Sequence, residues 1–238
     1  IGDLPEVVER EIDGDPVPVK VDLPVTINGR IFPREEIDYW TFDAKTGHSY
    51  TCEVMATRIG SPLDSQLTVI GPDGQTVDEN DDAIGSDSRI RFVAQANGLH
   101  KVRITDTSFN GLQDYVYRLT ITNGPWIEQL YPFGGSKGST TEFEIVGQSV
   151  HDGKFSFDIP TDSPAIIVHQ LEENGIRSNQ LYISTSDLPE IVERDDPTIR
   201  DEVRQGPIVL NGRIDQPGEI DSWKFQGVKD QQFVYDLQ

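Results

Sequence analysis

Acidic and amide side chains gather in one stretch of the sequence, and they are the strongest candidates for binding chemistry. Calcium ions in proteins are held by oxygen atoms from carboxylates, amides and backbone carbonyls. A dense group of such side chains is therefore a candidate calcium site. The candidate ligands are Asp64, Asp78, Asn80, Asp81, Asp82 and Asp87.

The spacing within this acidic loop limits the kind of site that it can form. Asp78-x-Asn80-x-Asp82 matches the start of an EF-hand loop. The match then fails, because Ala83 stands where the turn glycine belongs and Arg89 stands where the bidentate glutamate belongs. Two interpretations stay open: a looser calcium site, or a solvated loop whose Asp and Asn side chains cap its own backbone turns.

A second candidate for chemistry is the run Gly134-Gly135-Ser136-Lys137-Gly138, which satisfies the G-x-S-x-G pattern of serine hydrolases. That pattern activates its serine only on a sharp turn between a buried strand and a helix. Here Pro132 precedes the run and a β-strand is expected after it. We interpret the run as a glycine loop between two strands.

Histidine and cysteine side chains do not form a recognisable catalytic or metal-binding set. His48, His100, His151 and His169 are scattered, and none forms the closely spaced pair typical of zinc sites. The single cysteine, Cys52, lies on the apolar face of an alternating segment, which predicts a buried, inert thiol. We therefore predict no catalytic residues and no enzymatic activity for this chain.

The composition excludes two classes of partner. The chain has 41 acidic and 20 basic residues, for a net charge of -21. Nucleic acid is not an expected partner, because binding it requires clustered Lys and Arg. Membrane insertion is not expected either, because no stretch approaches the roughly 20 apolar residues of a membrane-spanning helix.

The pattern of turns and apolar residues predicts an all-β fold. Asn-Gly and Asp-Gly pairs, which favour tight hairpins, recur along the sequence. Short segments between them alternate apolar and polar residues, as in residues 50–54, 100–104 and 117–121. This is typical of antiparallel β-sandwiches. The one helical expectation is a single turn around Pro5–Arg10.

An internal repeat organises the chain. Residues 3–10 (DLPEVVER) return as residues 187–194 (DLPEIVER), and INGRI at 27–31 returns as LNGRI at 210–214. IDYWTF at 37–42 returns as IDSWKF at 220–225, and the strand positions 50, 52 and 54 align with Phe233, Tyr235 and Leu237. The apolar and turn positions recur while the solvent-side residues change, as expected for a repeated sandwich core. The second copy ends at Gln238, after its first few strands.

A series of segments from about Val25 to Thr122 of the first copy is specific in its order and spacing. These segments are NGRI at 28–31, IDYWTF at 37–42, GHSYT at 47–51, SPLDSQL at 61–67, GPDG at 71–74, ENDD at 79–82, SRI at 88–90, GLHKVRI at 98–104 and YRLT at 117–120. In this order and spacing the first copy resembles the bacterial pre-peptidase C-terminal domain, with His100 as a departure where the family usually has an aromatic residue. The resemblance implies a jelly-roll-like β-sandwich.

The sequence then divides into four parts. Residues 1–18 are interpreted as a linker from a preceding module, and residues 19–124 as the pre-peptidase C-terminal sandwich. Residues 125–186 resemble an immunoglobulin-like domain of the transcription-factor-immunoglobulin type, on the cue of the segment 131–138 and the strand 141–146 that follows it. Residues 187–238 are interpreted as an incomplete second copy of the first sandwich.

The resemblance implies export and a supporting role. We expect an extracellular, cell-surface or periplasmic location and a non-catalytic accessory function. The expected partners are other domains of the same protein, with an extracellular protein or polysaccharide as further candidates. Two alternatives stay open: an accessory region of a secreted hydrolase whose catalytic domain lies elsewhere, and a calcium-stabilised adhesive repeat.

Overall fold

The computed structural model describes residues 4–10, 17–148, 153–173, 175–193 and 203–237. Strands dominate the described residues, with one short 3-10 helix, η1 (Thr57–Ile59), which confirms the predicted all-β class. The described residues contain no helix that is long and apolar enough to cross a membrane. The chain divides into two compact units, one of residues 1–124 with 174–176 and one of residues 125–173 and 177–238.

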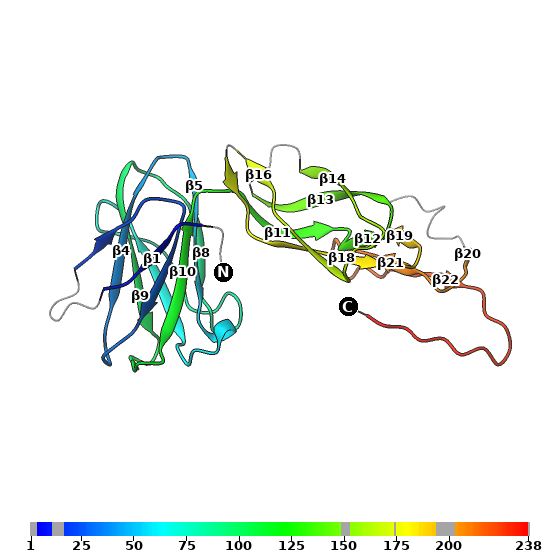
Figure 1. The fold of residues 1–238 in the computed structure, drawn as a ribbon, viewed down its shortest axis with the longest axis horizontal. Helices are drawn as coiled ribbons and strands as arrows, with labels where there is room; N and C mark the ends of the chain where they lie inside the picture. The colour runs from blue at the N-terminus through cyan, green and yellow to red at the C-terminus, as the bar shows by residue number, and fades with distance from the viewer. Residues whose placement is uncertain (1–3, 11–16, 149–152, 174, 194–202, 238) are drawn as a thin grey trace. The chain divides into compact units, whose positions relative to one another are not determined.

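The first unit is a sandwich of two five-stranded sheets (Figure 1). One sheet has the order β1 (Glu6–Val8), β3 (Val25–Arg30), β10 (Val116–Thr122), β5 (Ser49–Met55) and β8 (Arg89–Val93). The other has the order β2 (Val19–Lys20), β4 (Asp38–Ala44), β9 (Gly98–Asp106), β6 (Ser65–Ile70) and β7 (Thr76–Asn80). All pairings are antiparallel except the edge pairs β1–β3 and β2–β4, which are parallel.

One apolar core fills the space between these sheets. Along β10, the side chains of Tyr117, Leu119 and Ile121 are at most 1% exposed, whereas Arg118 and Thr120 between them are only half-buried. Side chains of both sheets belong to a single buried cluster. The alternation of apolar and polar residues from which the strands were predicted therefore also places the apolar side chains in the core.

His100 takes the place of an aromatic residue in this core. Its side chain is 1% exposed, and its ring stacks between Phe42, at 6.1 Å, and Phe92, at 5.7 Å between ring centroids. The departure noted in the sequence therefore keeps a flat ring at a position that requires one.

The helical turn expected around Pro5–Arg10 is wrong, because residues 6–8 form strand β1. Its pairing with β3 provides backbone hydrogen bonds from Thr26 to Pro5 and from Glu9 to Asn28, each 2.9 Å long. Val7 and Val8 are β-branched, which favours an extended backbone. Pairing with the edge of β3 thus outweighs the weak local preference for a turn of helix.

The described residues after Gly124 form two three-stranded sheets and three two-stranded ones. The three-stranded sheets have the orders β11 (Trp126–Tyr131), β13 (Thr140–Gln148), β14 (Lys154–Asp158) and β12 (Gly134–Ser136), β18 (Leu181–Ser186), β15 (Ile166–His169). The two-stranded sheets pair β16 (Glu172–Glu173) with β17 (Ile176–Arg177), β19 (Glu190–Val192) with β21 (Val209–Asn211), and β20 (Val203–Arg204) with β22 (Lys224–Phe225). A separate apolar cluster around Phe143 and Ile183 forms the core of the three-stranded sheets.

The first part of the glycine-rich run is a strand and not the expected loop, whereas Lys137 and Gly138 form a turn before β13. Gly134–Ser136 forms β12, which pairs in parallel with β18. A side chain at Gly134 would lie 2.1 Å from the backbone oxygen of Ser184, so only glycine permits this close approach.

The sequence repeat is also a repeat of contacts. Strand β19 pairs in parallel with β21 in the second copy, as β1 pairs with β3 in the first. In the first copy the Asn28 amide donates to the Glu6 carboxylate at 3.1 Å. In the second, the Asn211 amide donates to the Glu190 carboxylate at 3.0 Å.

The backbone at the end of β3 and the backbone just after β21 are held by equivalent hydrogen bonds. The Glu9 carboxylate accepts the backbone N–H of Arg30 at 2.8 Å, and the Glu193 carboxylate accepts that of Arg213 at 3.1 Å. Because the same side chains make the same bonds at equivalent positions, the two segments share a local fold as well as a sequence.

The agreement between the copies ends after β22. The alignment of Phe233, Tyr235 and Leu237 with strand β5 predicts a strand, but none forms over residues 226–237, which follow β22 as an extended segment (Figure 1). In the first copy β5 is held between β10 and β8. Counterparts of these two neighbours are absent from the described part of the second copy, so the segment has no ladder to join.

Gly29 is a position at which the core tolerates no side chain. A Cβ there would lie 2.3 Å from the ring of Tyr117, so we expect Gly29→Ala to destabilise the first unit by about 2 kcal/mol through overpacking. The matched control is Gly212→Ala, whose Cβ would meet the ends of two side chains, a carboxylate oxygen of Glu193 at 3.3 Å and one of Asp221 at 3.6 Å. Urea denaturation followed by tryptophan fluorescence checks both variants, and equal stabilities would contradict this packing.

Candidate functional site

The structure distributes the six candidate calcium ligands over several elements. Asp78 and Asn80 lie on edge strand β7, not in the expected loop, and only Asp81 and Asp82 begin the exposed loop that follows. Asp64 precedes β6, where its carboxylate accepts the Thr107 hydroxyl at 2.6 Å. The loop expectation was wrong for β7 because Thr76–Asn80 pairs with β6 along its length.

The side chains of two of these candidates accept hydrogen bonds from nearby backbone N–H groups. The Asn80 amide oxygen accepts the N–H of Arg89 at 2.9 Å, which ties β7 to the start of β8. The Asp78 carboxylate accepts the N–H of Glu79 at 2.9 Å. Both contacts are of the local side-chain-to-backbone kind that Asn and Asp make in turns and at strand ends.

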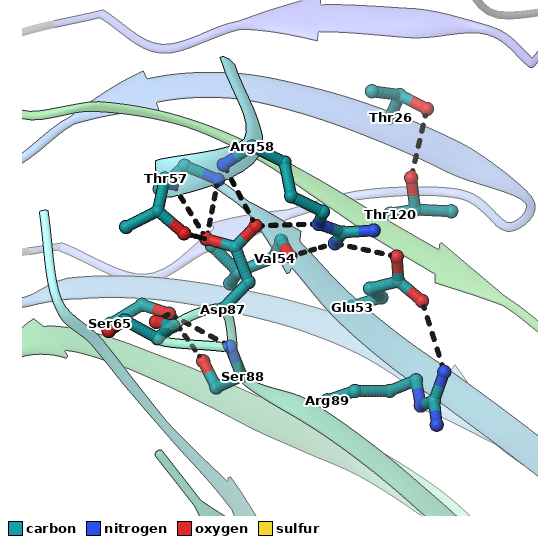
Figure 2. Close-up of polar contacts among 12 residues, drawn as sticks. Thr26, Glu53, Val54, Thr57, Arg58, Ser65, Asp87, Ser88, Arg89 and Thr120 are labelled. Carbon is teal, nitrogen blue, oxygen red and sulfur yellow. Dashed lines mark hydrogen bonds and ion pairs between the residues drawn. The ribbon is translucent and has the colours of Figure 1, made fainter. Parts of the chain in front are cut away.

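Asp87 is the most constrained of the candidates. Its side chain is fully buried, and one carboxylate oxygen accepts the N–H of Ala56 at 3.0 Å, and the N–H and hydroxyl of Thr57 at 2.7 and 2.9 Å (Figure 2). The other oxygen accepts Nε of Arg58 at 2.6 Å. Asp87 therefore caps the first turn of η1 from a distant segment, as an N-cap residue does locally.

The guanidinium of Arg58 extends this network to a neighbouring strand. Its Nη2 donates to the Glu53 carboxylate and to the backbone oxygen of Val54, both at 2.8 Å (Figure 2). Burial raises the pKa of Asp87, but the Arg58 side chain and the N–H groups of Ala56 and Thr57 lower it more. The pKa of Asp87 therefore lies below its ordinary value.

Among the described residues, no three His, Cys, Asp or Glu side chains gather in a way that could hold a metal ion. Asp87 already uses both oxygens on protein donors, whereas Asp81 and Asp82 are exposed. Calcium binding stays a prediction, and Asp81 and Asp82 are the candidate ligands whose side chains are exposed.

The remaining reactive side chains have structural surroundings. Cys52 is fully buried, and burial raises the pKa of its thiol to about 12, so it is not a thiolate at neutral pH. The Ser136 hydroxyl donates to the backbone oxygen of Leu188 at 2.9 Å, on a strand without a following helix. His169 packs against the rings of Phe155 and Phe157. His151 lies outside the described residues.

A surface pocket of about 220 Å³ lies in the first unit, lined by residues that include Asp43, Lys45, His48 and Tyr50. Its size is below the roughly 300–1,000 Å³ of typical small-molecule sites. One lining carboxylate, Asp43, is paired with Lys20 at 2.7 Å on the exposed surface.

A buried polar network that sequence analysis did not single out joins the two sheets of the first unit. The Tyr117 hydroxyl, on β10, donates to the Asp38 carboxylate at 2.7 Å and accepts the indole N–H of Trp40 at 3.0 Å, both on β4. All three side chains are buried. The available signal was an aspartate between the apolar residues Ile37 and Tyr39, repeated as Asp221 in the second copy.

The environment of Asp38 favours its protonated form. Burial raises its pKa, and the nearby Glu9 carboxylate raises it further, from 3.8 to about 9, although the Tyr117 hydrogen bond acts in the opposite direction. At neutral pH Asp38 therefore carries a proton. The contact between Asp38, on strand β4, and Glu9, after strand β1, therefore depends on a proton.

Comparison with known proteins identifies part of the first unit. Residues 36–106 match the family model of the bacterial pre-peptidase C-terminal domain, which confirms the resemblance over that range. A segment of 74 residues is 36% identical to the probable subtilase-type serine protease of Deinococcus radiodurans. That segment is 31% of this chain and spans only 10% of the length of the relative.

Solved structures that align with part of this chain were also found. The pre-peptidase C-terminal domain of a collagenase from Bacillus anthracis is 14% identical, with a TM-score of 0.39, over 47% of this chain and 100% of that one. A periplasmic inhibitor of g-type lysozyme from Aeromonas hydrophila is 14% identical, with a TM-score of 0.34, over 49% of this chain and 97% of that one.

Replacing Asp87 tests whether its carboxylate has a structural role or binds calcium. Asp87→Ala leaves Arg58 and buried N–H groups without their acceptor, so we expect a loss of about 3 kcal/mol of stability, equal in calcium and in EDTA. Asp81→Ala/Asp82→Ala alters only exposed side chains, and in EDTA we expect it to change stability by less than about 0.5 kcal/mol. Thermal and urea denaturation measure both.

The same experiment tests the calcium prediction. Bound calcium stabilises the folded chain by mass action, so a calcium site at the acidic loop raises the melting temperature in wild type but not in the double variant. A loss of stability in Asp87→Ala that appears only with calcium present would contradict the structural role of Asp87.

The raised pKa of Asp38 gives a pH dependence of defined sign. Between pH 3.8 and about 9, folded Asp38 keeps a proton that the unfolded chain has released, so rising pH lowers stability. Asp38→Asn preserves the acceptor for Tyr117 and cannot ionise. We expect it to gain on wild type as the pH rises, by at most about 1.4 kcal/mol per pH unit.

Urea denaturation at pH 5, 6, 7 and 8 measures this gain. Asp114→Asn, at an exposed position of the same unit, is the matched control. Equal pH dependences for the two variants would show that Asp38 ionises normally in the folded chain.

Proposed function

We propose that this chain is a non-catalytic accessory part of a secreted or cell-surface multidomain protein. The observation that carries the proposal is the pre-peptidase C-terminal domain at residues 36–106, combined with the structural use of its reactive side chains. Asp87 caps a turn, Cys52 is a buried neutral thiol, and His100 is a core ring. Such a domain can space, stabilise or present other domains.

The wider organisation that we propose is modular. Residues 125–186 act as an immunoglobulin-like spacer, and residues 187–238 belong to a second module of the first type. The matching hydrogen bonds of Asn28 and Asn211 support this repeat. The partners are then other domains of the same protein, with an extracellular protein or polysaccharide as a further contact.

A second candidate function is that of an accessory region of a secreted peptidase. It is favoured by the 36% identity to a segment of a protein named as a subtilase-type protease. The coding sequence on both sides of these residues distinguishes the two candidates. A peptidase domain there supports the second, whereas further β-modules without one support a structural array.

The absence of catalysis is directly testable. We expect the purified chain to show no turnover of casein, of fluorogenic peptides or of common polysaccharides above a buffer control. Ser136→Ala is the matched control variant, because Ser136 is the serine of the hydrolase-like run. Turnover that copurifies with the chain and disappears in a single-residue variant would contradict the proposal.

A further inference from the structure

Strand β15 lies at the edge of its sheet and carries no charge to protect that edge. It pairs with β18 on one side, and within the described part of the chain no strand pairs with its other side. Such an edge presents unpaired backbone groups, and proteins commonly protect it with charged side chains. The sequence Ile-Ile-Val-His of β15 contains no Asp, Glu, Lys or Arg.

The other outer strands differ from β15 in this respect. Among the outer strands of the described five-stranded and three-stranded sheets, β15 and the short glycine strand β12 alone lack a charged residue. The others carry Glu6 on β1, Lys20 on β2, Asp78 and Glu79 on β7, Arg89 and Arg91 on β8, Glu128 on β11, and Lys154 and Asp158 on β14. Charge therefore opposes edge-to-edge pairing at these strands but not at β15.

The outward face of β15 is apolar as well. Ile166 and Val168 are 55% and 54% exposed, whereas the alternate residues Ile167 and His169 pack against the apolar core beneath the sheet. Tyr182 on β18 lies opposite Val168 and is 61% exposed. The three exposed side chains form one apolar patch that extends to the unpaired edge.

The hydrogen bonds to β18 determine which backbone groups of β15 face the unpaired edge. The Thr185 N–H donates to the backbone oxygen of Ala165 at 2.8 Å, so the backbone of Ala165 faces β18. In an antiparallel ladder, successive residues direct their N–H and C=O groups to alternate sides of the strand. The N–H and C=O groups of Ile166 and Val168 therefore face the unpaired edge.

We propose that β15 pairs in antiparallel fashion with β15 of a second molecule of this chain, with Ile167 opposite the partner's Ile167. In this register Ile166 lies opposite the partner's Val168, and the two residues exchange both of their N–H···O bonds. The two-fold axis makes the same bonds between Val168 and the partner's Ile166. Backbone groups and exposed apolar side chains are thus paired by the same contact.

The alternation of side chains selects this register. A shift by one residue would place the exposed side chains of one strand beside the core-facing side chains of the other. A shift by two residues keeps the faces matched, but it places Ile166 opposite the partner's Gln170 and covers less apolar surface. The register centred on Ile167 pairs each exposed aliphatic side chain with another.

A second molecule is the occupant because β15 is complementary to itself. Without a charged residue, β15 cannot recognise an acidic or basic strand, so its complement is another uncharged apolar strand. The described outer strands offer one such strand, which is β15 itself. The net charge of -21 on each chain opposes association, so apolar contact and backbone pairing must hold the dimer.

Sedimentation equilibrium of the full chain tests the dimer and its driving force. We expect the Kd of dimerisation to fall as NaCl rises from about 0.05 to about 0.5 M, because salt screens the repulsion between the two acidic chains. Val168→Lys places a charge at the edge, and we expect it to raise the Kd about tenfold or more. The matched control is Val77→Lys, a residue of edge strand β7 that is 40% exposed. It should leave the Kd unchanged.

Cysteine crosslinking tests the register. Opposed residues of a non-hydrogen-bonded antiparallel pair have Cα atoms about 4.5 Å apart, which is within reach of a disulfide. Ile167→Cys should therefore link two molecules under mild oxidation about tenfold faster than Val168→Cys, whose two positions lie diagonally, about 7–8 Å apart. The native Cys52 is fully buried and does not compete.

Three outcomes would overturn the proposal. These are a chain that stays monomeric at both salt concentrations, a dimer that Val168→Lys does not weaken more than Val77→Lys does, and faster crosslinking at Val168→Cys than at Ile167→Cys. Thermal melts report whether each variant folds, and if Val168→Lys did not, the crosslinking alone would decide. The proposal does not depend on the accessory role, because a monomeric chain would leave the absence of turnover untouched.

Discussion

The Tyr117 side chain is the interaction on which the first unit most depends. Its ring rests on Gly29 of one sheet, while its hydroxyl reaches Asp38 and Trp40 of the other. A sandwich core is otherwise held by non-directional apolar contact, which leaves the relative placement of the sheets loosely specified. A buried and fully bonded hydroxyl adds direction, because any sliding of the sheets would leave buried polar atoms unpaired.

This constraint also explains the neighbouring sequence. The close approach of a tyrosine ring demands a glycine, the hydroxyl demands an acceptor, and a buried acceptor beside Glu9 demands a proton. Gly29 meets the first requirement and Asp38 meets the second. The segment that carries Glu9 accounts for the third. The same logic governs Asp87, whose buried charge persists because Arg58 and the first turn of η1 surround it with donors.

Much of the fold could be predicted from local patterns. Turn pairs and period-two alternation are short-range signals, and they correctly gave the all-β class and the strand that contains Cys52. The family-like segments correctly identified the domain now matched at residues 36–106. Errors arose where a distant strand decides the outcome, as when β3 draws Glu6–Val8 into a sheet and β6 draws Thr76–Asn80 out of the acidic loop.

The candidate site was harder to predict for the same reason. A sequence shows that Asp64, Asp78 and Asp87 are acidic, but not that Thr107, the Glu79 amide and Arg58 already bind them. Asp38 was overlooked because an acid at the start of a strand has no motif around it. Its role depends on Tyr117, 79 residues away. Such partners become visible only when the topology brings β4 and β10 together.

A double-mutant cycle between Tyr117 and Trp40 tests the central claim most directly. Tyr117→Phe, Trp40→Phe and the double variant are compared by urea denaturation of the full chain at pH 7. If the phenol joins the sheets through this hydrogen bond, the effects on the free energy of unfolding are coupled by about 1 kcal/mol or more. Additive effects would show that the two side chains contribute only as independent apolar groups, and would contradict the account.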